Sequence, residues 1–389
     1  MAHYPPQSKL DKVYRLQFLR SVQVVVKTAS QISCEVICGG EFNESVGIDL
    51  NYSVTFRVHS SSAITSIIEW QACTDVQCSS PRKGDGATVL KIRLPLSSAF
   101  YSIVISSSQH RDDTIILPII SEVFEALGAE DYQRYVTKTG PFIPRHLGCY
   151  RSFALIEKDV LVKEEYGVTL GSHIYDSSIV LMRYIERNIA ELVKIDAAAE
   201  RAVILDLGAG CGMVGLCIAA LLSGTQSNSS RPAESVATES ATADWPSSTV
   251  PCTVYITDRN QQKGLIEHNI SINPAITAGS VRVHYEDLDW ADAAQLDHVV
   301  EITKGAVSLV VAGDVFYDRE VAKLFFNVAS ALSAHNSGVR VLVAQKLRLN
   351  CDNQAVALIS EEEIRSECGF VNVSKVCHEA VVILWLLSM

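Results

Sequence analysis

Short apolar runs alternate with amphipathic stretches from about Arg151 to the end of the chain, and this alternation constrains the fold more than any other feature. Most of the apolar runs carry no alternating polar residues, which is typical of parallel strands covered on both faces. Amphipathic stretches such as residues 261–272 and 319–333 supply connecting helices. The pattern predicts an α/β fold with a mostly parallel sheet. Its parallel strands are expected at residues 202–207, 253–257, 281–285, 308–312 and 339–344.

The last two apolar segments are arranged differently. Residues 370–376 and 380–387 are separated by a connection that is too short for a crossover helix. They are therefore expected to form an antiparallel β-hairpin that closes the sheet. A parallel sheet that ends in such a hairpin is not the topology of a dehydrogenase.

The first 149 residues have a different pattern. Residues 22–26, 53–59 and 89–94 predict strands, and residues 119–136 predict a helix. We therefore expect two domains: an N-terminal β-rich module over residues 1–149, whose role the sequence does not indicate, and an α/β domain over residues 150–389. Residues 223–251 are rich in Ser, Thr, Ala and Pro. Because such a segment cannot bury enough apolar surface to order itself, it is expected to be a disordered insert.

Charge and cysteine content limit the class of protein. The 33 Lys and Arg against 44 Asp and Glu give a net charge of −11, which argues against a general polyanion-binding surface and leaves basic partners open. No apolar window reaches the ~18 residues of a membrane span, and residues 1–17 do not resemble a secretory signal. The eleven cysteines form no framework and indicate reduced thiols in the cytosol or nucleus. No Cys or His spacing predicts a metal site.

A glycine-rich turn follows the first strand of the α/β domain, in the run ILDLGAGCGMVG. The strand ends at Asp206, turns through Gly208, Ala209 and Gly210, and enters an apolar helix. Glycine lets the backbone approach a ligand, and a helix N-terminus offers unpaired N–H groups. The run fits a dinucleotide through its G-x-G-x-x-G spacing, and S-adenosylmethionine through D-x-G-x-G. The later motifs favour S-adenosylmethionine.

Acidic and aromatic residues follow the next strands. Asp258 ends the second strand, where a carboxylate accepts hydrogen bonds from ribose hydroxyls. Trp290 follows the third strand in the run EDLDW and offers a plane for an adenine ring. Gly313, Asp314 and Tyr317 follow the fourth strand, at the edge where ligands meet open α/β sheets. This last run is expected to put a carboxylate and a phenol at the reactive end of the cofactor.

Taken in order, these motifs resemble those of the seven-β-strand methyltransferases, specifically the family-16 protein lysine methyltransferases, over about residues 150–389. The segment around Tyr175 resembles the one that closes over the cofactor, with Tyr in place of the family's Trp. The resemblance implies a Rossmann-like seven-stranded methyltransferase sheet and S-adenosylmethionine as cofactor. It also implies cofactor contacts at Tyr175, Gly208, Ala209, Gly210, Asp258, Trp290 and Gly313, and it puts Asp314 and Tyr317 at the substrate amine.

The expected enzyme is a monomer that methylates the lysine ε-amine of a protein substrate of basic character. Two other classes remain open: a small-molecule or nucleic-acid N-methyltransferase, and a non-catalytic binding module on the same scaffold. A nucleic-acid amino-methyltransferase normally carries N/D-P-P-aromatic after strand four, where this chain has Gly-Asp-Val-Phe-Tyr. A binding module predicts eroded cofactor motifs, whereas the motifs here are intact.

Overall fold

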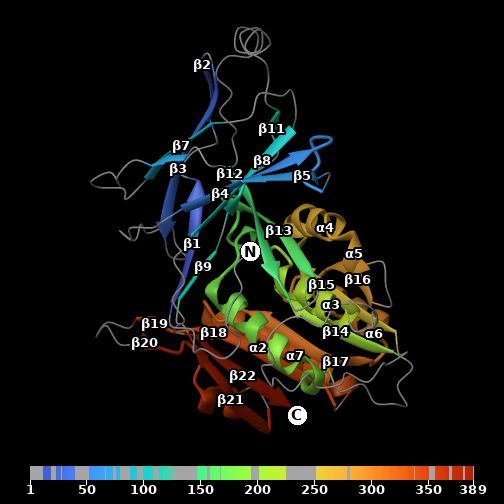
Figure 1. Ribbon diagram of the computed structural model, residues 1–389. Helices are drawn as coiled ribbons and strands as arrows, with labels where there is room; N and C mark the ends of the chain where they lie inside the picture. The colour runs from blue at the N-terminus through green and yellow to red at the C-terminus, as the bar shows by residue number, and fades with distance from the viewer. Residues whose placement is uncertain are drawn as a thin grey trace, which may run out of the picture. The chain divides into compact units, whose positions relative to one another are not determined.

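The protein divides into two compact units in the computed structural model (Figure 1). One unit contains Met1–Phe153 and Leu161–His173, and the other contains Ala154–Val160 and Ile174–Met389. The structure describes residues 12–18, 23–27, 29–39, 52–65, 67–72, 76–78, 88–93, 100–107, 114–117, 119–121, 124–125, 147–155, 158–166, 168–193, 201–224, 251–277, 281–336, 338–349, 355–367, 370–379 and 382–388.

A seven-stranded sheet forms the centre of the second unit, in the order β16-β15-β14-β17-β18-β22-β21. The first five strands in this order are parallel, and β22 and β21 are antiparallel to their neighbours. Both the parallel sheet and the C-terminal hairpin are therefore confirmed. The strands are β14 (Ala202–Leu207), β15 (Cys252–Asp258), β16 (Val281–Asp287), β17 (Val307–Gly313), β18 (Arg340–Lys346), β21 (Asn372–Glu379) and β22 (Val382–Ser388).

Helices cover both faces of this sheet. On one face, α2 contacts β17 and β18, and α3 contacts β15 and β16. On the other face, α6 and α7 pack in an apolar core with Val203, Leu205 and Leu207 of β14. Successive side chains of a strand point to opposite faces, so Asp206 points towards α3. The helices are α2 (Asp176–Leu192), α3 (Met213–Gly224), η2 (Asn260–Gln262), α4 (Lys263–Ser271), α5 (Pro274–Thr277), α6 (Ala293–Thr303), α7 (Arg319–His335) and α8 (Glu361–Glu367).

The strand order has a switch point beside β14. From β14 the chain proceeds outward through β15 and β16, and it then returns to place β17 on the other side of β14. In open α/β sheets, ligands bind outside the carboxyl ends of the strands at such a point. The turns after β14, β15, β16 and β17 all lie at this edge, which is where the sequence motifs fall.

The described strands of the first unit form two sheets. This confirms the β-rich character of the N-terminal region. Two strands of the second sheet, β12 and β13, include a few residues within 154–160, which belong to the other unit. One sheet contains β1 (Lys12–Phe18), β2 (Gln23–Lys27), β3 (Ala29–Gly39), β6 (Val76–Cys78), β7 (Thr88–Arg93) and β9 (Thr114–Leu117). The other contains β4 (Tyr52–His59), β5 (Ile67–Ala72), β8 (Phe100–Ser107), β10 (Ile119–Ile120), β11 (Phe124–Glu125), β12 (Leu147–Ala154) and β13 (Asp159–Tyr166).

The helix expected over residues 119–136 is wrong where the structure describes that segment. Ile119 and Ile120 form β10, which pairs with β8 and β12, and residues 124–125 form β11. A short apolar run has no periodicity that separates a strand from a buried helix, and pairing with distant strands decides the outcome here. Residues 126–136 lie outside the described part of the chain.

The insert expected at residues 223–251 is described only at its ends. Residues 223–224 close α3, and β15 begins at Cys252. The remaining positions, 225–250, lie outside the described residues, so the expectation of disorder stays a prediction.

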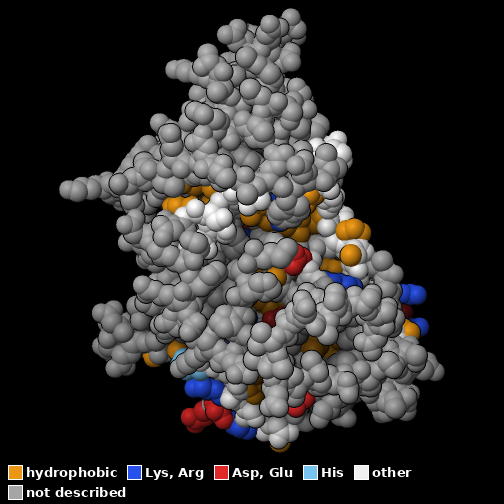
Figure 2. All heavy atoms as spheres, viewed as in Figure 1, with side chains coloured by type: hydrophobic (Ala, Val, Ile, Leu, Met, Phe, Trp, Pro, Cys, Tyr) orange, Lys and Arg blue, Asp and Glu red, His pale blue; other side chains and the backbone are white. Residues whose placement is uncertain are grey.

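The described surface carries charges of both signs. On the face drawn in Figure 2, acidic and basic side chains lie close together over its lower part, and neither sign covers this area alone. No helix in the described ranges is both long enough and apolar enough to span a membrane.

Candidate active site

The glycine turn after β14 is held against β15 by one backbone hydrogen bond and one side-chain hydrogen bond. The Ala209 N–H donates to the Thr257 carbonyl at 3.0 Å, and the Thr257 hydroxyl donates to the Asp206 carbonyl at 2.9 Å. Gly208 and Gly210 have φ values of +65° and +62°. This left-handed conformation is costly for residues with a Cβ, which explains glycine at both positions. Thr257 was not among the predicted site residues, although it directly precedes Asp258 in the sequence.

Asp258 lies directly against this turn. One carboxylate oxygen accepts the Gly210 N–H at 2.7 Å, and the other accepts the Arg259 N–H at 2.7 Å. Burial raises the pKa of Asp258, while these two N–H donors and the Arg259 charge act in the opposite direction. The structure thus brings Asp258 together with Gly208, Ala209 and Gly210, although 48 positions separate Asp258 from Gly210.

Trp290 reaches the same turn from the segment that follows β16. A Cβ at position 208 would lie 3.0 Å from Trp290 Cζ2, so the indole packs directly on Gly208. The indole also makes an edge contact with Phe325 of α7, with ring centroids 5.7 Å apart. The Leu288 N–H donates to the Asp258 carbonyl at 3.0 Å, which ties the Leu-Asp-Trp segment to the end of β15. The half-buried Trp290 therefore belongs to the cluster around the glycine turn.

Asp314 begins the loop after β17 and is buried. Its φ of 56° is in the left-handed region, and its N–H donates to the Ala344 carbonyl of β18 at 3.0 Å. Asp314 Oδ1 accepts the Lys346 N–H at 3.3 Å, and Oδ2 pairs with the Arg348 guanidinium at 3.2 Å. Arg348 was not among the predicted site residues, because its sequence position gave no sign of this pairing.

Tyr317 lies on the same loop and is 50% exposed. The next residue, Asp318, caps α7 by accepting the N–H groups of Glu320 and Val321 at 2.8 and 3.2 Å. This cap fixes the end of the loop, so Asp314 and Tyr317 share one short segment between β17 and α7. The structure leaves the Tyr317 ring open to solvent, whereas it buries Asp314.

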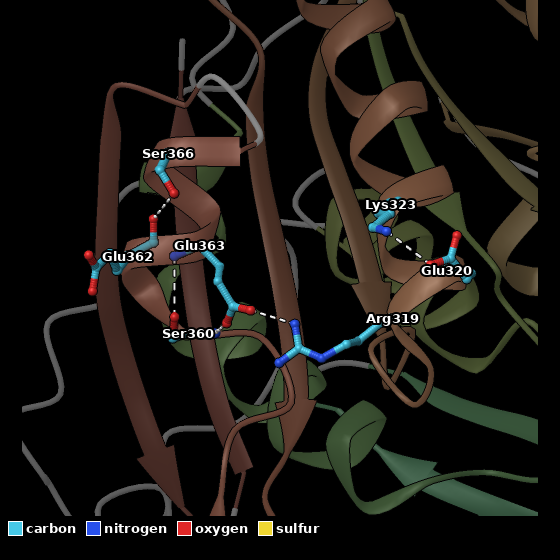
Figure 3. Close-up of polar contacts among 7 residues, drawn as sticks. All are labelled: Arg319, Glu320, Lys323, Ser360, Glu362, Glu363 and Ser366. Carbon is cyan, nitrogen blue, oxygen red and sulfur yellow. Dashed lines mark hydrogen bonds and ion pairs between the residues drawn. The ribbon is translucent and has the colours of Figure 1, made fainter.

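The helix that follows this loop is tied to α8 (Figure 3). Arg319 forms an ion pair with Glu363, whose carboxylate also accepts the Ser360 N–H at 2.7 Å. The hydrogen bond from Arg319 is the main cause that lowers the pKa of Glu363 to about 2. The Ser360 hydroxyl in turn accepts the Glu363 N–H at 3.2 Å, which is a capping box at the start of α8. The pair therefore stays ionised at neutral pH and holds α8 beside the first turn of α7.

Tyr175 precedes the first residue of α2, and its carbonyl accepts the N–H groups of Ser178 and Ile179 at 3.1 and 3.3 Å. Ser178 packs on Gly313 so closely that a Cβ at position 313 would overlap the Ser178 hydroxyl. The first turn of α2 therefore lies over the end of β17. This contact gives Gly313 a packing role and brings Tyr175 to the edge that carries Asp314.

Replacement of Gly313 by Ala tests this packing. The added methyl group would meet Ser178 Oγ and would lie 3.3 Å from Ser178 Cα. We expect Gly313→Ala to lower the free energy of unfolding by about 1–3 kcal/mol, the usual cost of overpacking. The double variant Gly313→Ala/Ser178→Ala, which removes the hydroxyl, should regain part of this loss in chemical denaturation. Equal losses in both variants would show that the Gly313–Ser178 contact is not the cause.

Asp206 is a buried acid. The sequence places it in the glycine-turn motif, but it was not among the predicted cofactor contacts. Its Oδ2 accepts the Gly215 N–H of α3 at 2.8 Å, whereas its Oδ1 has no hydrogen-bond partner among the described atoms. Burial is the main cause that raises the pKa of Asp206 to about 7; the Gly215 bond acts against burial, and the charge of Asp258 acts with it. Asp206 is therefore largely protonated below neutral pH.

This raised pKa predicts a pH-dependent stability. Between the unfolded-state pKa of about 3.9 and the folded-state pKa, the folded chain holds a proton that the unfolded chain has lost. The stabilisation is complete at low pH and disappears as the pH rises through about 7. From pH 5 to pH 8 the wild type should therefore lose about 2–3 kcal/mol relative to Asp206→Asn, which does not titrate. Denaturant unfolding at both pH values measures this difference, and parallel pH profiles would contradict it.

No group of His, Cys, Asp and Glu residues in the described ranges is arranged to hold a metal ion. The cluster instead combines a glycine turn, the acid Asp258, the indole of Trp290 and the polar groups of Asp314 and Tyr317. Such a set suits an organic ligand with hydroxyl groups and an aromatic ring.

Comparisons with known proteins give one match by sequence and slight likenesses by structure. No curated protein matches the chain at a significant level. A solved O-methyltransferase family 2 protein from Planctomyces limnophilus, in complex with apigenin, is 16% identical over 55% of this chain, with a TM-score of 0.30, and this chain spans 62% of that protein. A ferredoxin-NADP+ reductase from Plasmodium falciparum is 8% identical over 87% of this chain and 97% of its own, with a TM-score of 0.21. The fold is therefore assigned from the strand order.

The match by sequence is to the model of a family described as lysine methyltransferase. It spans residues 155–231 and 237–362, which together exceed half of the 389 residues. These ranges include the glycine turn, Asp258, Trp290 and the Asp314–Tyr317 loop, and membership of a methyltransferase family implies the use of S-adenosylmethionine. The chain belongs to the lysine methyltransferase family.

Proposed function

We propose that this chain is an S-adenosylmethionine-dependent enzyme that methylates the ε-amine of a lysine in a protein substrate. The observation that carries the proposal is the bond between Asp258 and the Gly210 N–H at 2.7 Å. It joins the acid of the second strand to the glycine turn of the first, at the switch point where nucleotide ligands bind.

The residues at this edge fit the cofactor. Gly208 is packed against Trp290 and Val315, so the glycine turn and the indole form one continuous surface. The Asp258 carboxylate is an acceptor for ribose hydroxyls, and the indole of Trp290 offers a plane for the adenine. We propose that Tyr175, Ala209, Gly210 and Gly313 complete the contacts around the methionine part.

Bound S-adenosylmethionine supplies a methyl group on a sulfonium, so that the C–N bond to the amine forms as the S–CH₃ bond breaks. The chain's own task is to position the amine, and correct orientation lowers the activation free energy by several kcal/mol. The Asp314 carboxylate accepts a hydrogen bond from the amine, and Tyr317 lines the approach. Because a lysine ammonium has a pKa of about 10.4, it must lose a proton before attack. Water is a sufficient acceptor for that proton.

Two features support a protein substrate over a nucleic acid. The family to which the chain belongs is described as lysine methyltransferase. The net charge of −11 opposes binding to a polyanion and suits a basic protein. A small-molecule amine is the second candidate, because Tyr317 is 50% exposed and therefore accessible to a free amine.

The test is transfer of a labelled methyl group. Purified protein and radiolabelled S-adenosylmethionine are incubated with a lysate of low methylation, and the products are separated into protein, RNA and small molecules. We expect label in one or a few protein bands, with methyl-lysine after hydrolysis. Label confined to RNA or to small molecules would overturn the proposal. Asp258→Ala serves as the control with weakened cofactor binding.

A further inference from the structure

Two cations, one in the last position of β18 and one just after this strand, neutralise two carboxylates at the candidate site. The Lys346 ammonium lies 2.9 Å from Asp176 Oδ2 at the start of α2. The Arg348 guanidinium lies 3.2 Å from Asp314 Oδ2. They are alternate residues in the run AQKLRLN, and residues 348–349 form a short strand, β19 (Arg348–Leu349). One extended segment therefore sets the charge at this edge.

The Asp314 carboxylate is already occupied. Its side chain is only 4% exposed, and its two oxygens accept from the Lys346 N–H and from Arg348. Arg348 is 35% exposed, and its Nε–H is buried without a hydrogen-bond partner in the described part of the chain. The guanidinium thus extends from a buried carboxylate towards solvent, and its Nε–H has no acceptor among the described residues. An incoming group that bonds to Asp314 must share the carboxylate with Arg348 or displace it.

We propose that Arg348 is a positioning residue for the acceptor: its guanidinium holds Asp314 Oδ2, repels a protonated amine and so favours the neutral amine that can accept a methyl group. This inference rests on the proposed function, in which Asp314 faces the lysine amine. With Arg348 present, the pair has no net charge. Without it, Asp314 is a free carboxylate that attracts an ammonium ion and stabilises its proton.

The charged groups around this carboxylate support the assignment. Arg348 comes from β19, Lys346 from β18 and Asp176 from α2, and Tyr317 lies on the Asp314 loop. Lys346 is paired with Asp176, so these two charges offset each other. Arg348 is therefore the cation whose removal leaves Asp314 without a counter-charge.

The experiment compares steady-state kinetics of the wild type and Arg348→Gln on a methyl-accepting protein over pH 6–10. An opposite charge nearby shifts a pKa by about 1–3 units, so the bound amine should keep its proton to higher pH in the variant. We expect KM for the acceptor to fall about threefold, kcat near pH 7.5 to fall about tenfold, and the rising limb of kcat to move up by about one pH unit. A merely structural role would not lower KM together with kcat and also move the pH profile.

Two further variants keep the result clear. Arg348→Lys retains the positive charge and should return the pH profile most of the way to that of the wild type. Arg340→Gln removes the same charge at the opposite end of β18, where Arg340 donates to the Glu191 carbonyl, and should leave the profile in place. An Arg348→Gln profile that does not move, or a raised KM, would overturn the inference. If the wild type transfers no methyl group to protein, the proposed function itself fails. If the wild type is active but the Arg348→Gln profile does not move, only the inference about Arg348 fails.

Discussion

Asp314→Asn is expected to lower methyl transfer at least about 10²-fold while S-adenosylmethionine affinity stays within a few-fold of the wild type. The variant keeps the shape of the side chain and removes the charge that pairs with Arg348 at 3.2 Å. The proposed cofactor contacts come from the glycine turn, Asp258 and Trp290, which do not depend on that charge. A misplaced amine alone accounts for a loss of this size.

Asn is the right replacement because of the backbone at this position. Asp314 has a φ of 56°, and Asn tolerates the left-handed region better than most residues. Asp314→Ala adds strain of about 1–3 kcal/mol to the loss of the carboxylate, so its effect on rate mixes two causes. Thermal unfolding should show Asp314→Asn close to the wild type.

Single-turnover methyl transfer to the protein substrate measures the rate, and calorimetric titration measures cofactor binding. Lys323→Gln is a matched control, since it changes an exposed charge on the helix that follows the same loop, where Lys323 pairs with Glu320 at 2.9 Å. We expect its rate to equal that of the wild type. If Asp314→Asn transfers methyl groups at close to the wild-type rate, Asp314 only closes β17 and has no part in catalysis.

The sheet could be predicted because its signal is local. The β14 run AVILDL is buried at every position, and Asp206 is its one polar residue; a strand buried on both faces reads as a nearly continuous apolar run. Its predicted limits, residues 202–207, are those observed. The β10 segment had the same kind of apolar run, but only its pairing with distant strands made it a strand.

The candidate site could be predicted in part for the same reason. Glycines and acids at strand ends are visible as motifs, and parallel strands bring their carboxyl ends to one edge. The partners of those residues are not visible in this way. Arg348 lies 34 positions from Asp314, and Ser178 lies on a helix remote in sequence from Gly313. Neither contact leaves a periodic or compositional trace, because each depends on how α2 and β18 pack on β17.

Asp258→Ala is expected to weaken S-adenosylmethionine binding by about 10- to 100-fold. A hydrogen bond to a charged group contributes about 1.5–3 kcal/mol, and about 1.4 kcal/mol is a factor of ten in affinity. The variant removes the proposed acceptor of the ribose hydroxyls. It also removes the partner of the Gly210 N–H, which the structure shows at 2.7 Å.

Asp258→Asn separates these two effects. Its amide oxygen can still accept the Gly210 N–H and hold the glycine turn, but the negative charge and the acceptor of the Arg259 N–H are lost. If the charge acts on the ribose, Asp258→Asn should also bind the cofactor several-fold more weakly than the wild type. If Asp258 only supports the turn, Asp258→Asn should bind as the wild type does.

Asp287→Asn controls for the general effect of an acid at this edge. Asp287 ends β16 beside Asp258 in the sheet, and it accepts the Tyr285 hydroxyl at 2.6 Å without contacting the glycine turn. Its replacement removes the same charge one strand further from β14, so cofactor affinity should stay within a few-fold of the wild type. Calorimetric titration of all three variants decides the question. If Asp258 binds the ribose, cofactor affinity must fall in the order Asp287→Asn, Asp258→Asn, Asp258→Ala. Equal affinities in a folded Asp258→Ala and the wild type would remove Asp258 from the cofactor site.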